Sequence, residues 1–330
     1  AAAIYTFKLQ YPSFLFPGKT QYDHGYAPEG VPITRAINSV NPLNWFSIGL
    51  RLRRTRPDLV IMRYWLPFLA PALGFIARLV RSNRHTRVIT IFDNVVPHEK
   101  RFGDTILTRF FVKSIDGALV MTRAVETDLR QFSAVLPCVV SPHPLFDNYS
   151  VPVSRAEAIV RLKLCPADRF ILFFGFIRQY KGLDLLLRAM AEQCVRDLGV
   201  KLIVAGEFYE SEKPYFDLIH QLGIGDRISF HSHFISDDEV KYYFSAASLV
   251  VQPYRSATQS GVTQVAYHFN KPMIVTNVGG LAEIVPDGVC GYVVEPDPAE
   301  ISVAICDFFR SEENRFEGGI QEKKKEYSWD

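Results

Sequence analysis

The fold is decided by the stretch Phe173-Phe-Gly-Phe-Ile-Arg-Gln-Tyr-Lys-Gly182, which leads directly into Leu183-Asp-Leu-Leu-Leu-Arg-Ala-Met190. An apolar run of strand length ends at Gly175, a short loop carries Arg178 and Lys181, and the apolar spacing that follows is that of an amphipathic helix. A buried strand that passes through a loop into a helix is the repeating unit of a parallel α/β sheet. The rest of the chain is expected to repeat this unit.

The C-terminal half continues the alternation. We expect strands at 170–174, 201–205, 228–230, 249–252, 273–276 and 291–294. We expect helices at 183–192, 213–222, 237–246 and 262–269. Near-continuous β-branched runs of this kind, separated by helices, predict a parallel sheet that is covered on both faces.

The N-terminal half shows the same pattern less regularly. Strands are expected at 1–7, 59–64, 88–92, 117–121 and 139–140, with helices at 67–81, 104–114 and 125–131. The proline-rich stretch Ser141–Pro152 interrupts the alternation and is expected to be a linker. The predicted fold is therefore α/β, with two Rossmann-like doubly wound domains, 1–149 and 150–330, facing a cleft at the carboxyl ends of their strands.

Composition limits the class of protein. The 330 residues are 48% hydrophobic and 22% charged, which is typical of a globular chain, and 37 Lys and Arg nearly match 35 Asp and Glu. This balance provides no overall basic field for nucleic acid. Five scattered cysteines without a CxxC motif indicate reduced thiols in a cytoplasmic protein. The longest apolar stretch, 66–80, is too short to span a membrane and contains two prolines and an arginine.

Both ends of the chain suggest truncation. Ala1–Phe7 begins without methionine and already has the pattern of a strand, so we expect the first strand and helix of the N-terminal domain to be missing. The polar tail from Gly318 ends on an aromatic residue, as if a further element had been removed. One local basic cluster, Arg51–Arg56, has two interpretations: a solvated helix end stabilised by the helix dipole, or a patch for anionic lipid.

Two loops contain residues suited to phosphate chemistry. Arg178 and Lys181 lie between a strand and a helix, where two cations suit a diphosphate whose negative charge grows as it leaves. The alternative is that they only cover a solvated helix start, although cations there oppose the helix dipole. In the second loop Ser260 is expected to cap a helix that begins near Val262, with Gly261 allowing a phosphate to approach the backbone N–H groups.

The order of motifs resembles the C-terminal domain of family 4 glycosyltransferases, over residues 170–309. The motifs are Gly175-x-x-Arg-x-x-Lys-Gly182, Val204-Ala-Gly-Glu207, Pro253-Tyr254, Ser260-Gly-Val262, Lys271-Pro-x-Ile-Val-Thr276, Gly279-Gly-Leu-Ala-Glu-Ile-Val285 and Gly288-x-x-Gly-Tyr-Val293. The resemblance implies a retaining enzyme of the GT-B fold. It would move a hexosyl or N-acetylhexosaminyl group from a nucleotide-diphosphate sugar to a glycan or lipid-linked acceptor. Residues 150–330 would hold the donor and residues 1–149 the acceptor.

The resemblance also assigns residues to roles. Arg178 and Lys181 would neutralise the donor diphosphate, while Phe234 stands where the family's main chain meets the nucleobase. The positions carried over as donor-binding are Gly175, Gly206, Glu207, Phe234, Ser260, Gly261, Val262, Gln264, Gly280 and Glu283. For Glu283 a purely structural role is an equal alternative.

The chain departs from the family pattern at several positions. The family commonly carries two glutamates where this chain has Ala257 and Val265, and Gln264 is the candidate to replace the second in contacting the ribose. In the N-terminal half, Asp93 follows a phenylalanine where the family usually has a histidine. His98 is expected either to replace that histidine in catalysis or merely to cap its loop.

Other chemistries lack their signatures. The chain contains no Asp-x-Asp triad, no HExxH, no clustered His/Cys set and no Walker A motif. With two cations to offset the phosphates, we expect a metal-independent reaction without a further cofactor. Two alternatives remain: a non-catalytic subunit that senses nucleotide sugars, and a sugar-nucleotide epimerase on the same fold. A lipid-linked acceptor would place the protein at the inner membrane face.

Overall fold

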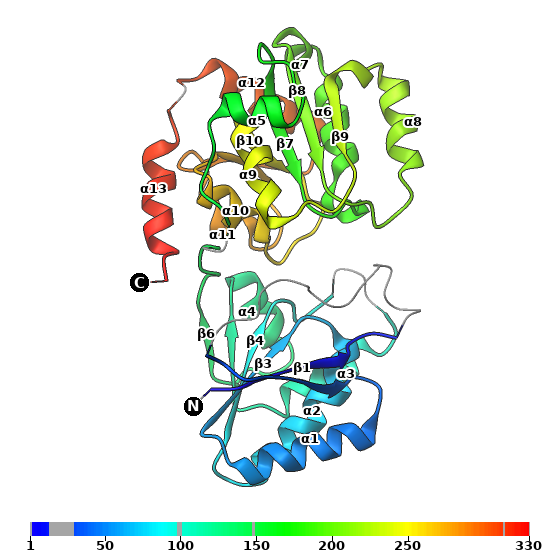
Figure 1. Ribbon diagram of the computed structural model, residues 1–330, viewed down its shortest axis with the longest axis vertical. Helices are drawn as coiled ribbons and strands as arrows, with labels where there is room; N and C mark the ends of the chain where they lie inside the picture. Colours follow the sequence, from blue (N-terminus) through cyan, green and yellow to red (C-terminus); the bar gives the residue numbers. More distant parts are fainter. Residues whose placement is uncertain (1, 13–29, 98–100, 147–148, 313, 330) are drawn as a thin grey trace. The chain divides into compact units, whose positions relative to one another are not determined.

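The computed structural model describes residues 2–12, 30–97, 101–146, 149–312 and 314–329. The chain divides into two compact units, residues 1–141 and 142–330 (Figure 1). This division falls eight residues before the expected boundary at 149. The beginning of the proline-rich stretch is tied to the second unit, because the Leu145 N–H donates to the Tyr327 carbonyl (2.8 Å) and the Trp329 Nε1 donates to the Leu145 carbonyl (2.9 Å).

The first unit contains a four-stranded parallel sheet whose strands follow chain order. These strands are β3 (Leu59–Tyr64), β4 (Arg87–Phe92), β5 (Gly117–Val120) and β6 (Cys138–Val140). A separate parallel pair consists of β1 (Ile4–Leu9) and β2 (Ile33–Asn38). Strand β2 was not assigned from the sequence, because its run of alternating apolar and polar residues is short. Only one side chain of this strand, that of Ile37, is buried.

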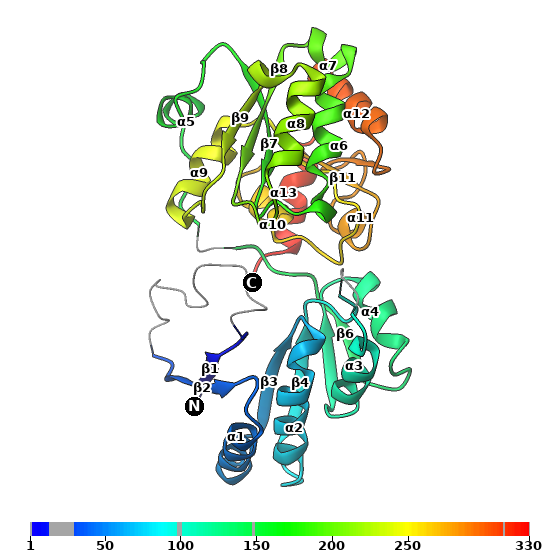
Figure 2. The ribbon, with the colours of Figure 1, turned by 90° about the vertical axis from the view of Figure 1, so that its right-hand side faces the viewer.

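Helices of the first unit pack on the apolar face of this sheet (Figure 2). They are α1 (Pro42–Thr55), the 3₁₀ helix η2 (Pro67–Leu69), α2 (Ala70–Arg81), α3 (Asp104–Val112) and α4 (Arg123–Arg130). The core centres on Tyr64, whose ring stacks on Phe111 at 4.4 Å between centroids and whose hydroxyl bonds to Thr108. Along β3, the side chains of Leu59 and Ile61 are exposed. The expected cover on both faces is therefore not found at β3 within the described residues, although the strand assignments agree.

The second unit contains a six-stranded sheet, and every strand pairing in it is parallel. In chain order the strands are β7 (Arg169–Phe174), β8 (Val200–Ala205), β9 (Ile228–His231), β10 (Leu249–Gln252), β11 (Met273–Thr276) and β12 (Gly291–Val294). Their spatial order is β12-β11-β10-β7-β8-β9. The chain therefore builds outward from β7 to β9 and then crosses to β10, on the other side of β7.

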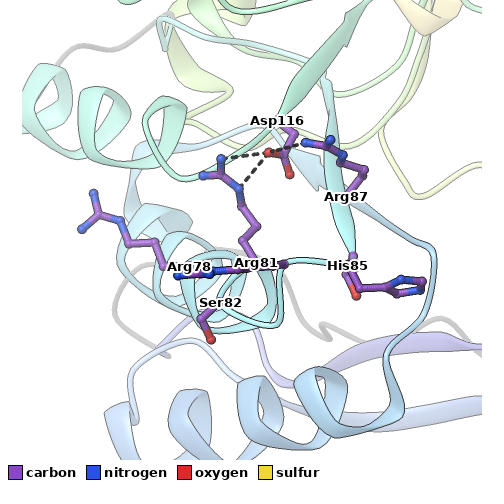
Figure 3. Close-up of a pocket in the computed structure, with 8 residues that line it drawn as sticks. Arg78, Arg81, Ser82, His85, Arg87 and Asp116 are labelled. Carbon is purple, nitrogen blue, oxygen red and sulfur yellow. Dashed lines mark hydrogen bonds and ion pairs between the residues drawn. The ribbon is translucent and has the colours of Figure 1, made fainter.

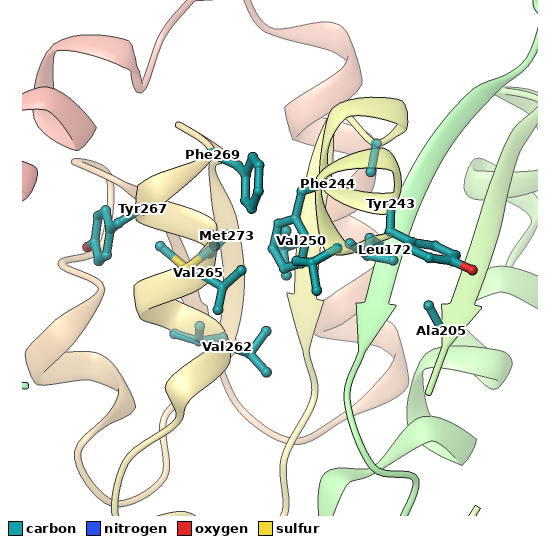
Figure 4. Packing of buried hydrophobic residues seen from close by; sticks show 14 of the residues in the cluster. Leu172, Ala205, Tyr243, Phe244, Val250, Val262, Val265, Tyr267, Phe269 and Met273 are labelled. Carbon is teal, nitrogen blue, oxygen red and sulfur yellow. The ribbon is translucent and has the colours of Figure 1, made fainter. Parts of the chain in front are cut away.

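Helices cover both faces of the second sheet, as the sequence predicts (Figure 1). They are α5 (Arg155–Arg161), α6 (Leu183–Ala191), α7 (Gln193–Asp197), α8 (Lys213–Leu222), α9 (Asp237–Ala246), α10 (Gly261–His268), α11 (Leu281–Ile284), α12 (Pro298–Arg310) and α13 (Glu317–Glu326), with the 3₁₀ helices η3 (Gln179–Lys181) and η4 (Gly225–Arg227). Successive β7 residues alternate between two cores, Phe170 and Leu172 entering one and Ile171 and Phe173 the other. In the first core Phe244 of α9 and Phe269 stack at 5.2 Å beside Leu172 (Figure 4).

The C-terminal tail differs from its expected character. Residues 317–326 form α13, which buries Ile320 and leads to Tyr327, a buried residue whose ring lies 5.5 Å from that of Tyr267. The polar sequence hides this packing because only two of its side chains are buried. Across the described ranges no helix combines the length and apolar character that a membrane span requires.

Stability of the second unit is expected to depend on Arg227. This nearly buried guanidinium donates to the carbonyls of Met190, Val195 and Val200 at 2.7–3.1 Å, and so joins helix ends to the start of β8. Arg227→Met should lower the free energy of unfolding, measured by urea titration, by about 3 kcal/mol because buried carbonyls lose charged donors. The exposed control Arg188→Met should change it by less than about 0.5 kcal/mol. Equal effects of the two substitutions would contradict this role.

Candidate functional site

The order of strands in the second unit identifies where a ligand is expected. After β7 the chain continues to β8 on one side of β7, and it later returns to place β10 on the other side. The loops that follow the neighbouring strands β7 and β10 therefore lead in opposite directions along the sheet. In open α/β sheets, ligands bind outside the carboxyl ends of the strands at this switch point. The two loops that the sequence analysis singled out are these two loops. Their proximity follows from the pairing of Val250 with Leu172.

The first turn of α10 and the loop after β7 meet at Gly175. A Cβ atom added to Gly175 would lie 3.1 Å from the Lys181 Nζ and 3.6 Å from the Val262 Cγ2. Gly175 also has a φ of +98°, a conformation that favours glycine. The structure therefore brings together three of the predicted residues, Gly175, Lys181 and Val262, from two loops that are 80 positions apart.

Lys181 is a half-buried residue whose ammonium has no carboxylate partner among the described residues. Its Nζ lies 5.5 Å from the centre of the Tyr254 ring, which is itself buried. Burial lowers the pKa of Lys181 below its usual value, and the nearby Arg178 guanidinium acts in the same direction. An ammonium that is desolvated and lacks a counter-ion is a strong attractor for an anionic ligand.

Ser260 caps α10, as the sequence predicts. Its Oγ accepts from the Val262 N–H at 3.3 Å and lies 3.3 Å from the Tyr254 hydroxyl. Burial raises the pKa of Tyr254 to about 12, so this hydroxyl stays protonated. The N–H of Gly261, the first residue of the helix, has no acceptor within the described ranges. One unpaired N–H at the positive end of a helix dipole, next to Lys181, is suited to a phosphate oxygen.

Arg178 lies at the start of η3, where its guanidinium carbon is 5.0 Å from the centre of the Tyr209 ring. The Tyr209 ring contacts Phe176 in turn, at 4.4 Å between centroids. The part of the chain that the structure describes offers Arg178 no carboxylate. Its charge therefore remains available to a ligand, while the tyrosine ring holds the side chain by a cation–π contact.

Arg255 is a structural residue that was not singled out from the sequence. Both of its terminal nitrogens donate to the Asp184 carboxylate at 2.6 Å, and its backbone N–H donates to the Tyr180 carbonyl at 2.7 Å. These bonds tie the loop after β10 to η3 and to the first turn of α6. No local signal in the sequence connects an arginine and an aspartate that lie 71 positions apart.

Glycines allow the loops to pack main chain against main chain. A Cβ atom at Gly182 would lie 2.0 Å from the Pro253 carbonyl oxygen, and one at Gly206 would lie 2.1 Å from that of Gly175. Gly279 would place its Cβ atom 1.4 Å from the Ala257 carbonyl oxygen. Each separation is far below van der Waals contact, so side chains at these positions would force the loops apart. The carboxyl edge is thus a layer of closely packed backbone.

The remaining predicted positions lie on loops at the same edge or on α11. The Glu207 carbonyl accepts from the Ile177 N–H at 2.8 Å, and the Gly280 N–H donates to the Thr258 carbonyl at 3.2 Å. Phe234, in the loop after β9, is 66% exposed. Glu283 is an exposed side chain of α11. These positions are compatible with ligand contact, and their roles stay predictions.

The Gln264 side chain is not positioned to contact a ribose. Its side chain is 1% exposed, and neither amide atom has a hydrogen-bond partner in the described residues. In this conformation the amide offers almost no surface to a ligand. Ala257 and Val265, which stand where the family commonly has glutamates, are also buried and pack in the apolar core. A carboxylate at either position would be desolvated, which is consistent with their apolar character here.

In the first unit, Asp93 directly follows β4 and its carboxylate is held by Arg63. The Arg63 Nε and Nη2 donate to the two carboxylate oxygens at 2.8 and 3.1 Å. Asp93 is therefore a partner in an ion pair and not a free base. His98 lies outside the described residues, so both interpretations of it stay open. His143, in the second unit, contacts the Phe146 ring at 4.8 Å between centroids.

Two histidines near the end of β9 were not singled out from the sequence. The His231 Nε2 lies 3.2 Å from the Ser229 hydroxyl, and its ring lies 5.1 Å from that of Tyr243. Burial lowers the pKa of His231, and His233 reinforces the shift. Both histidines line a cavity of about 290 Å³. Across the described residues, no group of three or more His, Cys, Asp and Glu side chains is arranged to hold a metal ion.

The fold and this site define a class of protein: two Rossmann-like α/β units, of which the second has two cationic side chains at its switch point, Arg178 and Lys181. Solved structures share this fold. A sucrose-phosphate synthase from Thermosynechococcus elongatus has a TM-score of 0.74 at 18% identity, covering 98% of this chain and 83% of its own. Anabaena HepE, solved in complex with UDP, has a TM-score of 0.71 at 18% identity, covering 90% and 82%. The GT-B fold expected from the sequence is thereby confirmed.

Residues 168–311 match the family described as Glycosyl transferases group 1, so the second unit carries a domain of that family. Curated relatives agree. The D-inositol 3-phosphate glycosyltransferase 1 of Catenulispora acidiphila is 34% identical over 200 residues, 57% of this chain and 47% of the relative. The D-inositol 3-phosphate glycosyltransferase of Segniliparus rotundus is 33% identical over 253 residues, 73% and 55% respectively. The chain spans about half the length of the curated relatives it matches.

The contact between Gly206 and Gly175 is expected to be necessary for the site. Gly206→Ala would force a Cβ atom against the Gly175 carbonyl at a φ of +145°, and should lower the midpoint of thermal unfolding and disturb the loop that positions Lys181. Gly199→Ala is the matched control, because its φ is also positive (+64°) but no atom lies within 4 Å of the added methyl. It should cost only about 1 kcal/mol. The expectation fails if the two variants unfold at the same temperature.

Proposed function

We propose that this protein is a glycosyltransferase that moves a sugar from a nucleotide-diphosphate sugar to a glycan or lipid-linked acceptor. The observation that carries the proposal is the meeting of Lys181, Gly175 and the first turn of α10 at the switch point of the second sheet. A partly desolvated ammonium without a carboxylate, an unpaired helix N–H and a nearby guanidinium form a site for a doubly charged diphosphate.

The same residues suggest how the site would assist the reaction. When the bond between the sugar and the diphosphate breaks, negative charge develops on the leaving phosphate. Lys181 and Arg178 would stabilise that charge, and the Gly261 N–H would donate to a phosphate oxygen. These groups are already held by Tyr254, Tyr209 and the capped helix, so little reorganisation is needed during the step. Such a site offsets the charge with protein cations, and we propose that it works without a metal ion or further cofactor.

The comparisons support a nucleotide sugar as donor. Anabaena HepE was solved with UDP and also with UDP-glucose, and the curated relatives are named as glycosyltransferases. A uridine nucleotide is therefore the first donor to test. Retention of the anomeric configuration, a hexosyl or N-acetylhexosaminyl group and a cytoplasmic location with access to a lipid-linked acceptor are parts of the proposal that rest on the family resemblance.

The second candidate function is that of a non-catalytic subunit that senses nucleotide sugars. It is favoured by one observation: Ala257 and Val265 replace the glutamate pair common in the family and are buried in the core. A sensor would bind the nucleotide without slow hydrolysis of its sugar conjugate. Release of free sugar from UDP-glucose over several hours, followed by chromatography, separates the two functions.

Arg178→Ala and Lys181→Ala are expected to weaken the response to nucleotides. A ligand present at about 100 times its dissociation constant stabilises the native protein by about 2.7 kcal/mol, which shifts the midpoint of thermal unfolding measurably. Screening UDP, GDP and ADP with their sugar conjugates should give a shift for one base in the unchanged protein. Each alanine variant should reduce that shift and lower turnover at least a hundredfold, because a charge that stabilises the leaving group is lost.

A matched control for these variants is Arg188→Ala, an exposed residue on the helix that follows the same loop. It should keep both the nucleotide shift and the turnover. The diphosphate site is wrong if Lys181→Ala and Arg178→Ala turn over at the rate of the unchanged protein, or if no nucleotide shifts its unfolding.

Donor affinity is expected to depend on pH through Lys181. Because burial lowers the pKa of this amine, the free protein loses the proton at a pH below the usual value of about 10.4. Between the lowered and the usual pKa the unfolded chain binds more protons, so stability of the free protein rises with pH there. Diphosphate favours the charged amine, so binding in that window takes up a proton and the affinity falls as pH rises.

Calorimetric titration with UDP in two buffers of different ionisation enthalpy measures this proton uptake. Lys181→Met should bind more weakly and show no uptake from this group, so its affinity should vary less with pH. Equal proton uptake by the variant and the unchanged protein would exclude Lys181 as the group responsible.

A further inference from the structure

Helices α1 and α2 of the first unit lie side by side, parallel and in register. Trp45 contacts Phe75 at 6.4 Å between ring centroids, and a Cβ atom at Gly49 would lie 2.8 Å from the Leu79 Cδ2. Further along, the Asn83 side chain donates to the Arg53 carbonyl. These three contacts advance by four residues on each partner, so equivalent turns of the two helices are neighbours. Their carboxyl ends therefore lie at the same place.

Arginines gather where these two ends meet. They line two adjoining cavities, of about 350 and 480 Å³, that share Ser82. The arginines are Arg53, Arg54, Arg56, Arg78, Arg81, Arg84 and Arg87, and we call this set the basic surface. Two carboxylates, Asp58 and Asp116, bond to its side chains or to adjacent His85. Together with these two carboxylates, the seven arginines carry a net charge of +5, whereas the whole chain carries +2.

Most of these charges have no carboxylate partner among the described residues. Arg81 and Arg87 reach Asp116, whereas Arg78 and His85 point away from it (Figure 3). Arg53, Arg54, Arg56, Arg78 and Arg84 form no ion pair there, although the Arg78 Nε donates to the Ser114 Oγ at 2.9 Å and its guanidinium lies over the Phe110 ring. Like charges held this close repel one another, so the cluster lowers the stability of the free protein.

Stabilisation by the helix dipole does not account for the basic surface. A cation in the last turn of a helix contributes about 0.3–1 kcal/mol, and that effect is confined to the final turn. Arg56 and Arg84, which follow α1 and α2, also adopt positive φ angles of 46° and 57°. Glycine is the residue that favours this conformation at helix ends. Neither arginine is therefore the residue that its backbone conformation favours, and each is replaceable by glycine without backbone strain.

The basic surface is separate from any ligand edge of its own sheet. Arg87 is the first residue of β4, and Asp116 directly precedes β5. Both therefore lie at the amino ends of the strands, opposite to the carboxyl edge where ligands of such sheets bind. The basic surface is accordingly independent of the proposed donor site.

Apolar side chains are exposed on the amino-terminal halves of the same two helices. Leu43 is 82% exposed and Phe46 is 50% exposed on α1, and Phe75 is 39% exposed on α2. Leu43, Phe46, Leu50 and Arg54 follow a spacing of three or four residues and so share one face of α1. That face is apolar in its first half and basic in its second.

We propose that the outer face of α1 and α2 docks on an anionic lipid bilayer. Lipid phosphates would neutralise the unpaired arginines, and Leu43, Phe46 and Phe75 would enter the boundary between headgroups and acyl chains. A soluble polyanion such as nucleic acid would satisfy the arginines but would leave these apolar side chains in water. A bilayer surface is the partner that satisfies both halves of the face.

The test is sedimentation of the full chain with vesicles of phosphatidylcholine, alone or mixed with phosphatidylglycerol. The unchanged protein should bind the mixed vesicles and not the neutral ones, and binding should weaken in 1 M salt because the Debye length falls from about 10 to about 3 Å. Arg56→Gly/Arg84→Gly should reduce the affinity by at least about tenfold. Glycine suits both backbone conformations, so this variant should unfold at an unchanged or higher temperature.

Matched variants separate charge, apolar contact and general damage. Lys163→Gly/Arg188→Gln removes two exposed cations of the second unit, one of them also at a positive φ (+55°), and should bind vesicles normally. Leu43→Ser/Phe46→Ser should weaken vesicle binding without weakening retention on immobilised polyphosphate, whereas Val160→Ser/Val303→Ser should change neither.

Three results would overturn the proposal. The first is that the unchanged protein fails to bind mixed vesicles, and the second is that it binds neutral vesicles equally well. The third is that Leu43→Ser/Phe46→Ser binds vesicles normally, which would assign the basic surface to a soluble polyanion. A nucleotide shift measured on the same preparation reports on the donor site separately, so either proposal can fail alone.

Discussion

Close packing of main chain against main chain at the carboxyl edge of the second sheet is the constraint on which the site depends. Gly206 leaves room for the Gly175 carbonyl, and Gly182 leaves room for that of Pro253. Because no side chains separate these loops, the Lys181 amine lies beside Gly175 and is partly shielded from water. The lowered pKa of this cation and its closeness to α10 are consistent with that backbone packing.

The protein holds unpaired cations in two different physical settings. Lys181 is half-buried, so the main cost of leaving it unpaired is desolvation, which lowers its pKa. The arginines around Ser82 are largely exposed, so their cost is mutual repulsion, which salt screens. Binding of a ligand at Lys181 is therefore expected to depend on pH, and binding of a partner at the arginines is expected to depend on ionic strength.

Periodicity predicted the regular elements well where it was strong. The helices 213–222 and 237–246 have the bounds expected from the sequence, and so do the strands β10 (249–252) and β11 (273–276). It missed α12, although that helix buries Ile301, Ala304 and Ile305, and it also failed where an element buries few side chains. Strand β2 buries only Ile37, and α13 buries Ile320 before Tyr327, so neither produces a clear apolar pattern. Short amphipathic elements such as these are stabilised by their neighbours and not by their own composition.

The sequence by itself determined the order of elements, the residues of the loops after β7 and β10, and the resemblance to glycosyltransferases, because these depend on local spacing and residue type. Only the tertiary structure decided which residues meet. The return of the chain to place β10 beside β7, the pairing of Arg255 with Asp184, the burial of Gln264 and the parallel register of α1 with α2 are contacts between distant positions. Such contacts depend on the packing of whole elements, which local periodicity does not specify.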